Sequence, residues 1–202
     1  MSTSKQASYH HGDLPTALID TALTLLATTS AEALSLREVA RRAGVSAAAP
    51  YRHFADKEAL LAAVAARGFD QLGERLLAAD QGRSPQDALV AQGVAYVSFA
   101  LEQPAMFQLM FSRFSDKSRY PLLKKAGEGA YAVLADRVAM QVAQPKRMVL
   151  EAGSWALVHG LALLFLDGDL LTRINCPSEE ATRDIVEAFL SPAIARASGK
   201  KR

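Results

Sequence analysis

The chain has 202 residues, half of them hydrophobic, which is enough to bury a sizeable core and excludes a disordered protein. Its formal net charge of +2 gives little support for nucleic-acid binding by bulk charge, and its single cysteine excludes an internal disulfide. The sequence has no run of about 18 uncharged apolar residues and no apolar core of a signal peptide, so we expect a cytoplasmic protein that does not contact membranes.

The N-terminal segment predicts a polar arm and then an amphipathic helix. Residues 1–12 are polar and lack a helix cap, which indicates a flexible arm. Asp13 is a favourable N-cap, and apolar residues recur at helical spacing between Leu14 and Leu26. We therefore expect the first helix to begin directly after Asp13.

Two short helices and a long one are predicted next. Ser35 and Glu38 have the spacing of a capping box, so a second helix begins there. Gly44 ends it, because glycine adopts left-handed backbone conformations without a steric penalty. A third, short helix is expected over residues 46–54, and a long fourth helix over about 57–79.

The rest of the chain predicts a helical bundle without β-alternation or internal repeats. Prolines mark helix breaks or first turns, at Pro85, Pro104, Pro121, Pro145 and Pro177. The expected helices span residues 85–102, 104–112, 118–141, 146–167 and 178–197. The predicted fold class is therefore all-α, with about nine helices in total.

Residues 36–54 have the size and punctuation of a helix-turn-helix, in which the second helix enters the major groove of DNA. Side chains suited to phosphate oxygens cluster on and after this helix, namely Tyr51, Arg52, His53 and Lys57. Candidates for reading base edges are Ser46, Ala47, Ala48 and Arg37. Alanine can only touch thymine methyl groups or let the backbone approach, so DNA shape should contribute strongly to specificity.

Several stretches resemble the DNA-binding domain of the tetracycline-repressor-like (TetR) family: Ser35-Leu-Arg-Glu-Val-Ala-Arg-Arg-Ala-Gly-Val-Ser46, Pro50-Tyr-Arg-His-Phe54 and Lys57-Glu-Ala-Leu-Leu61. Two others resemble one branch of that family, with a Trp-His-Gly-like signature: Tyr9-His-His-Gly-Asp-Leu14 and Trp155-Ala-Leu-Val-His-Gly160. The family usually has Leu before Tyr51, where this chain has Pro50. Its ring removes the hydrogen bond to the Ser46 carbonyl, so we expect a slightly tightened or bent recognition helix.

The resemblance implies roles for particular residues and a homodimer. Tyr51, His53 and Lys57 would clamp phosphates, and the residues between Ser46 and Tyr51 would read bases. The helices over 146–167 and 178–197 would form a four-helix dimer interface, with Ala152, Ala156, Leu163, Leu164, Ile185 and Phe189 as candidate interface residues. Without the resemblance, a core within one chain would show the same pattern of small and apolar residues.

The second half concentrates bulky, adaptable side chains of the kind that line pockets for small apolar ligands. The candidate ligand-binding residues are Phe69, Tyr96, Phe99, Phe107, Met110, Phe111, Tyr131, Trp155 and His159. Any one of them can equally be an ordinary core residue.

The sequence therefore predicts an all-α, homodimeric transcriptional regulator that binds double-stranded operator DNA. Its expected parts are the arm 1–12, a three-helix helix-turn-helix domain over 13–65, and a ligand-sensing and dimerisation bundle over 66–202. A small apolar effector would shift the population of the fourth helix and release a repressor from DNA. The alternatives are a helical DNA-binding protein without an inducer and a helical interaction protein that does not bind DNA.

An enzyme is disfavoured, because the sequence contains no nucleophile motif and no glycine-rich phosphate loop. Cys176 has no histidine near it in sequence and is expected in a loop. The four histidines, His10, His11, His53 and His159, lack the spacing of a structural metal site. We therefore expect no cofactor and no metal.

Overall fold

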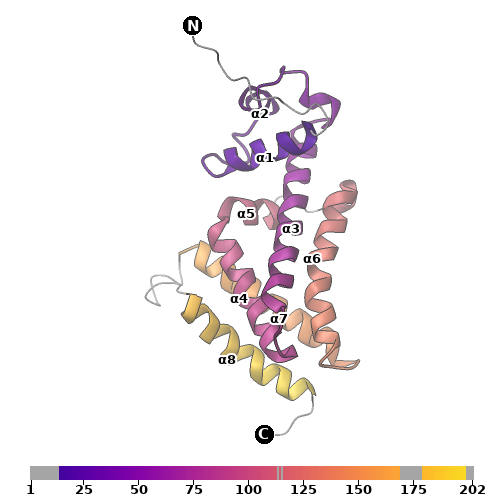
Figure 1. Ribbon diagram of the computed structural model, residues 1–202, viewed down its shortest axis with the longest axis vertical. Helices are drawn as coiled ribbons and strands as arrows, with labels where there is room; N and C mark the ends of the chain where they lie inside the picture. Colours follow the sequence, from indigo (N-terminus) through magenta and orange to yellow (C-terminus); the bar gives the residue numbers. More distant parts are fainter. Residues whose placement is uncertain (1–13, 113, 115, 169–178, 199–202) are drawn as a thin grey trace. The chain divides into compact units, whose positions relative to one another are not determined.

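The computed structural model describes residues 14–112, 114, 116–168 and 179–198 (Figure 1). Every regular element in these ranges is a helix, so the all-α prediction is confirmed. Eight are α-helices and two are 3-10 helices. The chain divides into two compact units, residues 1–64 and 65–202. The predictions for the arm, for the Asp13 cap and for Cys176 lie outside the described residues.

The first unit contains α1 (Leu14–Leu26), α2 (Leu36–Arg42), the 3-10 helix η1 (Pro50–Arg52) and the start of α3 (Lys57–Asp80). The helices α1 and α2 pack together through residues that are fully buried, among them Leu18, Ala22, Val39 and Ala40. This apolar stripe is the one that the helical spacing predicts.

The ends of α2 follow the local signals in the sequence. The Ser35 hydroxyl accepts a hydrogen bond of 3.2 Å from the Glu38 amide and caps the helix. Gly44 has a φ of +72°, and the amides of Gly44 and Val45 donate to the carbonyls of Arg41 and Ala40. This bonding pattern is a Schellman motif, which satisfies the last carbonyl groups of a helix. The predicted start and stop of the second helix are confirmed.

The third predicted helix, residues 46–54, is not an α-helix, and that expectation was wrong. Pro50 has no N–H, so the bond to the Ser46 carbonyl that an α-helix requires cannot form. The Ala49 amide donates to that carbonyl instead, at 2.9 Å, and the His53 amide donates to the Pro50 carbonyl at 3.0 Å. Both are bonds between residues three apart, so the segment consists of a turn followed by η1. The tightening expected from Pro50 thus extends as far as His53, while the Phe54 amide donates to the Pro50 carbonyl, four residues earlier, at 2.9 Å.

The second unit is built around α4 (Pro85–Glu102), which packs against α5 (Pro104–Ser112), α6 (Pro121–Ala139), α7 (Lys146–Leu166) and α8 (Glu179–Ser198) (Figure 1). The approach of α4 to α7 and α8 is close at Gly93. A Cβ atom there would lie 2.7 Å from Cγ1 of Val186 and 3.2 Å from Cγ1 of Val158, so the glycine permits this packing.

The predicted helix over 118–141 is divided in the structure. A 3-10 helix, η2 (Lys117–Arg119), is capped by the Asp116 carboxylate, and α6 begins separately at Pro121. Proline disfavours helical backbone angles in the residue before it, and Tyr120 accordingly has a ψ of 83°. The other predicted spans in this unit agree with the observed helices to within one residue.

The helix α7 has apolar residues on both its buried and its exposed sides. By length and composition it is the one helix among the described ranges that is apolar enough to cross a membrane, although the sequence pattern predicted none. Its most apolar window has a mean hydropathy of 1.7, and a third of that window is buried inside the protein. Because α7 packs on α4, α6 and α8, its apolar character partly reflects core packing.

Candidate DNA-binding surface and ligand cavity

The turn of the helix-turn-helix and η1 lie at the surface of the first unit. Of the predicted DNA contacts, Lys57 is half-buried, and the others are exposed: Arg37, Ser46, Ala47, Ala48, Tyr51, Arg52 and His53. Pro50 and Phe54 are the buried residues of this segment and anchor it in the first unit. Its outer side therefore presents small side chains next to a phenol, a guanidinium and an imidazole.

The predicted phosphate ligand Lys57 has a partner inside its own unit. Its Nζ atom donates to the Glu32 carbonyl at 2.5 Å. The amide of Ala59 donates to the Asp56 carboxylate at 2.8 Å, which caps α3. An ammonium group at the first turn of a helix lies where the free N–H groups also attract anions.

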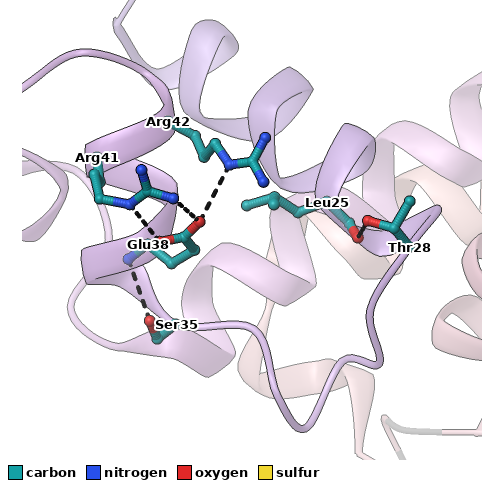
Figure 2. Close-up of polar contacts among 6 residues, drawn as sticks. All are labelled: Leu25, Thr28, Ser35, Glu38, Arg41 and Arg42. Atoms are coloured by element: carbon teal, nitrogen blue, oxygen red, sulfur yellow. Dashed lines mark hydrogen bonds and ion pairs between the residues drawn. The ribbon is translucent and has the colours of Figure 1, made fainter.

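A charged cluster occupies the exposed side of α2 (Figure 2). The Glu38 carboxylate accepts from Arg41 at 2.6 and 2.7 Å and from Arg42 at 3.2 Å. Hydrogen bonding to Arg41 is the main reason that the pKa of Glu38 falls to about 2. The capping box expected from the sequence is therefore only half formed, since the Glu38 side chain turns toward the two arginines (Figure 2).

The second unit contains a partly open cavity of about 370 Å³, which lies in the size range of roughly 300–1,000 Å³ common for small-molecule sites. Its wall is mostly apolar and comes from α3 through α8. On α3 the wall is formed by Phe69, Leu72 and Leu76, which repeat along one helix face. Such a chamber fits an apolar ligand and leaves room for a few polar contacts.

Five of the nine predicted ligand-binding residues line this cavity: Phe69, Tyr96, Phe111, Tyr131 and Trp155. The other four, Phe99, Phe107, Met110 and His159, are not part of its wall. Phe99, Phe107 and Met110 are completely buried, so the structure places them in the core of the bundle. They are packed there and are not among the residues that line the cavity.

His159 lies behind the cavity wall in an aromatic cluster. It shares a hydrogen bond of 2.8 Å with the Tyr96 hydroxyl and packs against the rings of Phe107, Phe111 and Trp155. Burial lowers the pKa of His159 and raises the pKa of the Tyr96 phenol. Both shifts favour the uncharged forms, so this pair holds the Tyr96 ring in place without a charge.

Sequence reasoning missed the polar residues of the wall, chiefly Gln92, Lys117 and Ser154. Gln92 interrupts the apolar run of α4, and this could have drawn attention to it, because a polar residue inside a buried helix needs a partner. Lys117 and Ser154 have no comparable signal.

An apolar stripe remains exposed on the outer sides of α7 and α8. The predicted interface residues lie on it: Ala152, Ala156, Leu163, Leu164 and Phe189 are exposed, and Ile185 is half-buried. Phe189 is 64% exposed, although large aromatic side chains are normally well covered in monomers. Met148 and Val149 extend the stripe toward the start of α7.

Two family profiles match the chain. Residues 18–64 match the profile of the bacterial regulatory proteins of the tetR family, and residues 89–189, half of the chain, match the tetracyclin repressor-like C-terminal domain. The chain belongs to the TetR family. It is therefore a DNA-binding transcriptional regulator and not an enzyme, as the sequence predicted.

Solved structures share the fold of this TetR-family protein. A protein of unknown function from Rhodococcus sp. RHA1 is 28% identical, with a TM-score of 0.80, and the match covers 96% of this chain and all of that one. A TetR-family regulatory protein from Rhodococcus RHA1 is 20% identical (TM-score 0.59, covering 91% and 96% of the two chains). A TetR variant from Acinetobacter baumannii AYE, in complex with minocycline, is 18% identical (TM-score 0.65, covering 93% and 96%). No curated protein sequence matches the chain.

Proposed function

We propose that this TetR-family regulator is a homodimeric repressor, released from its operator when a small, largely apolar molecule binds in the cavity of the second unit. The observation that carries the proposal is a single chain with an exposed helix-turn-helix in one unit and an apolar cavity of about 370 Å³ in the other. A structural neighbour that binds minocycline supports the sensory part.

At the DNA, Tyr51, His53 and Lys57 would contact phosphates and fix the register, because Tyr51 and His53 are exposed and the half-buried Lys57 follows them closely in the chain. The turn at Ser46, Ala47 and Ala48 would lie against base edges. Two methyl side chains let the backbone come close to the groove floor and favour thymine methyl groups. Lys57 would exchange the Glu32 carbonyl for a phosphate oxygen, a stronger, charge-assisted hydrogen bond.

The exposed stripe on α7 and α8 supports the dimer. A second copy of the same stripe would cover Phe189, Leu163 and Leu164, which a monomer leaves exposed to water. A symmetric pair also provides two recognition segments, which an operator with two half-sites one helical turn apart requires.

Operator binding would be linked to the cavity through α3. This helix carries Lys57 near its start and Phe69, Leu72 and Leu76 in the cavity wall. A ligand that binds more tightly to one position of α3 shifts the population toward it, by no more than its difference in affinity between the two states.

Selection of duplexes from a random library by the purified protein tests the DNA-binding part. We expect enrichment of a palindrome with half-sites one turn apart, and strongly salt-dependent but sequence-blind binding would contradict it. Lys57→Met should lower the salt dependence by about one released counterion. Lys125→Met, which removes an exposed lysine of the second unit, is the matched control and should leave it unchanged.

Operator affinity measured with and without a ligand tests the sensory part. Native mass spectrometry of protein purified from cells identifies molecules that remain bound, and an organic extract of the denatured protein is then added to the operator complex. We expect the extract to weaken operator binding by roughly 5- to 150-fold, the usual range of allosteric coupling. Equal affinities with and without the extract would reject ligand-induced release.

A further inference from the structure

The cavity wall contains one positive charge that no carboxylate neutralises among the described residues. Of the residues that the structure describes, three with charged side chains line the cavity: Lys117, Lys124 and Glu128. Lys124 and Glu128 form an ion pair of 3.8 Å, and both are exposed. The Lys117 ammonium instead lies over two aromatic rings, 4.5 Å from the centre of Phe69 and 5.6 Å from that of Phe111.

Ring contacts attract a cation but leave its charge in place. Lys117 is half-buried, and burial lowers its pKa because the surroundings solvate the ammonium less well than water does. An anion in the cavity next to Phe69 and Phe111 would relieve this loss of solvation. The Lys117 side of the cavity is therefore suited to a negatively charged group.

Two buried polar residues, Gln92 and Ser154, also belong to the wall of this cavity. Gln92 is 3% exposed and Ser154 is 2% exposed, and neither Gln92 Oε1 nor Ser154 Oγ has a hydrogen-bond partner among the described residues. The other amide atom of Gln92, Nε2, donates to the Asp80 carboxylate at 3.4 Å. A carboxylate only accepts hydrogen bonds, so the Gln92 side chain must direct its NH₂ group toward Asp80. Gln92 Oε1 then lies on the side away from Asp80 and is available as an acceptor.

A buried acceptor without a donor destabilises a protein, and native structures almost always provide a partner. A hydroxyl group can donate to Gln92 Oε1 and accept from Ser154 Oγ at the same time. The far part of the cavity is therefore suited to a small neutral group that both donates and accepts.

The two polar parts lie at opposite ends of one apolar wall. Lys117 lies over Phe69, and Gln92 bonds to Asp80, and both partners belong to α3. Asp80 lies eleven positions after Phe69, which is three helical turns on the same face and about 16 Å of axial rise. Leu72 and Leu76 line the cavity between them.

We infer that the ligand of this cavity is an amphipathic carboxylic acid, with its carboxylate at Lys117, an apolar chain or ring system along Leu72 and Leu76, and a hydroxyl group at Gln92 and Ser154. The inference rests on the proposed function for the existence of a ligand and adds its chemical class. Neutral apolar molecules would contact the same apolar wall but would leave Lys117 and Gln92 without partners.

Three probes of equal chain length separate the contribution of the carboxylate to binding from that of the hydroxyl group: decanol, decanoate and ω-hydroxydecanoate. The chain has one tryptophan, Trp155, and it lines the cavity, so its fluorescence reports binding to the full-length protein directly. We expect decanoate to bind roughly tenfold more tightly than decanol, the change that corresponds to one charge-assisted hydrogen bond. The added hydroxyl should tighten binding further, by roughly fivefold.

Variants assign each gain to a side chain. Lys117→Met should abolish the preference for decanoate over decanol, while Lys117→Arg should retain it. Lys124→Met is the matched control, because it removes a lysine of the same wall that Glu128 already neutralises, and the preference should remain. Gln92→Leu should abolish the gain from the hydroxyl and leave decanoate binding intact.

The inference is overturned if decanol binds as tightly as decanoate, if the preference survives Lys117→Met, or if none of the three probes changes the fluorescence of Trp155. In each of these cases a protein that still selects a palindromic operator, and still leaves it when the organic extract of the denatured protein is added, retains the proposed function with a ligand of another class. Loss of operator selection in the wild-type protein would refute the proposed function itself.

Discussion

The buried ion pair between Asp80 and Arg137 should be asymmetric in its effect on stability. Asp80, the last residue of α3, is 9% exposed, whereas Arg137 of α6 is 19% exposed, and the two side chains are in direct contact. Removal of one partner from a buried pair leaves an uncompensated charge and costs about 3–5 kcal/mol. Arg137→Met leaves the more deeply buried charge with only the Gln92 amide, so we expect a loss of about 3 kcal/mol.

Urea unfolding followed by Trp155 fluorescence, at one fixed protein concentration, measures this loss. With a urea dependence of about 2 kcal/mol per molar, the midpoint should fall by about 1.5 M. The double variant Asp80→Leu with Arg137→Met should recover to within about 1 kcal/mol of the wild type, because neither charge then remains buried. Arg183→Met, in the exposed pair with Glu179, is the control and should cost less than about 0.5 kcal/mol.

A shift for Arg137→Met no larger than that of the Arg183→Met control would refute the reasoning, because water would then solvate Asp80 as well as it solvates a surface carboxylate. A double variant that is less stable than Arg137→Met alone would refute it too. The positioning of Gln92 in the cavity depends on the same carboxylate, so the stability result also bears on the ligand site.

Three further predictions concern single side chains. Ser35→Ala removes the cap of α2 and should destabilise the first unit by about 1 kcal/mol, seen as faster hydrogen exchange of the α2 amides. Glu38→Gln frees Arg41 and Arg42 to bind phosphates and should raise the affinity for DNA of any sequence. The salt dependence of that binding should increase by roughly one to two released counterions, and an unchanged dependence would contradict this. Burial lowers the pKa of His159 in the folded protein below the ordinary histidine value of about 6.5. As the pH falls through that value, His159 therefore binds a proton in the unfolded chain before it does so in the folded protein, and the free energy of unfolding should fall. Urea midpoints near neutral and mildly acid pH check this, and His159→Gln should show a smaller fall than the wild type.

Local signals made much of the fold predictable. The cap at Ser35, the left-handed Gly44 and the proline-started helices depend on a few adjacent residues, so they hold in almost any tertiary context. Pro50 shows the limit of such reasoning. Its missing N–H was recognised, but the loss of one bond left the amides up to His53 with bonds between residues three apart, and the four-residue spacing returns only at the Phe54 amide, which donates to the Pro50 carbonyl at 2.9 Å. In a segment of this length, one missing bond is a large share of the total.

The cavity was predictable only in outline. Phe111 lines it and Phe107, four residues earlier on the same helix, does not, although both are apolar aromatic residues at helical spacing. Which of them borders the cavity depends on where α3, α4 and α6 leave space, and this is a property of the packed bundle. Lys117 was missed for a different reason, since its position over Phe69 depends on the turn η2 between two separate helices.

The helices α7 and α8 each have two apolar faces with different tasks. Their inner faces border the cavity through Trp155, Val158 and Leu190, and their outer faces carry the stripe proposed to join two protomers. Gly93 permits both helices to lie close against α4, because a Cβ atom there would clash with them. Any coupling between the proposed effector binding and the proposed self-association would act by the same factor in both directions. With such a coupling, dilution of the regulator in a cell would change its sensitivity to the effector, so its copy number would tune the response.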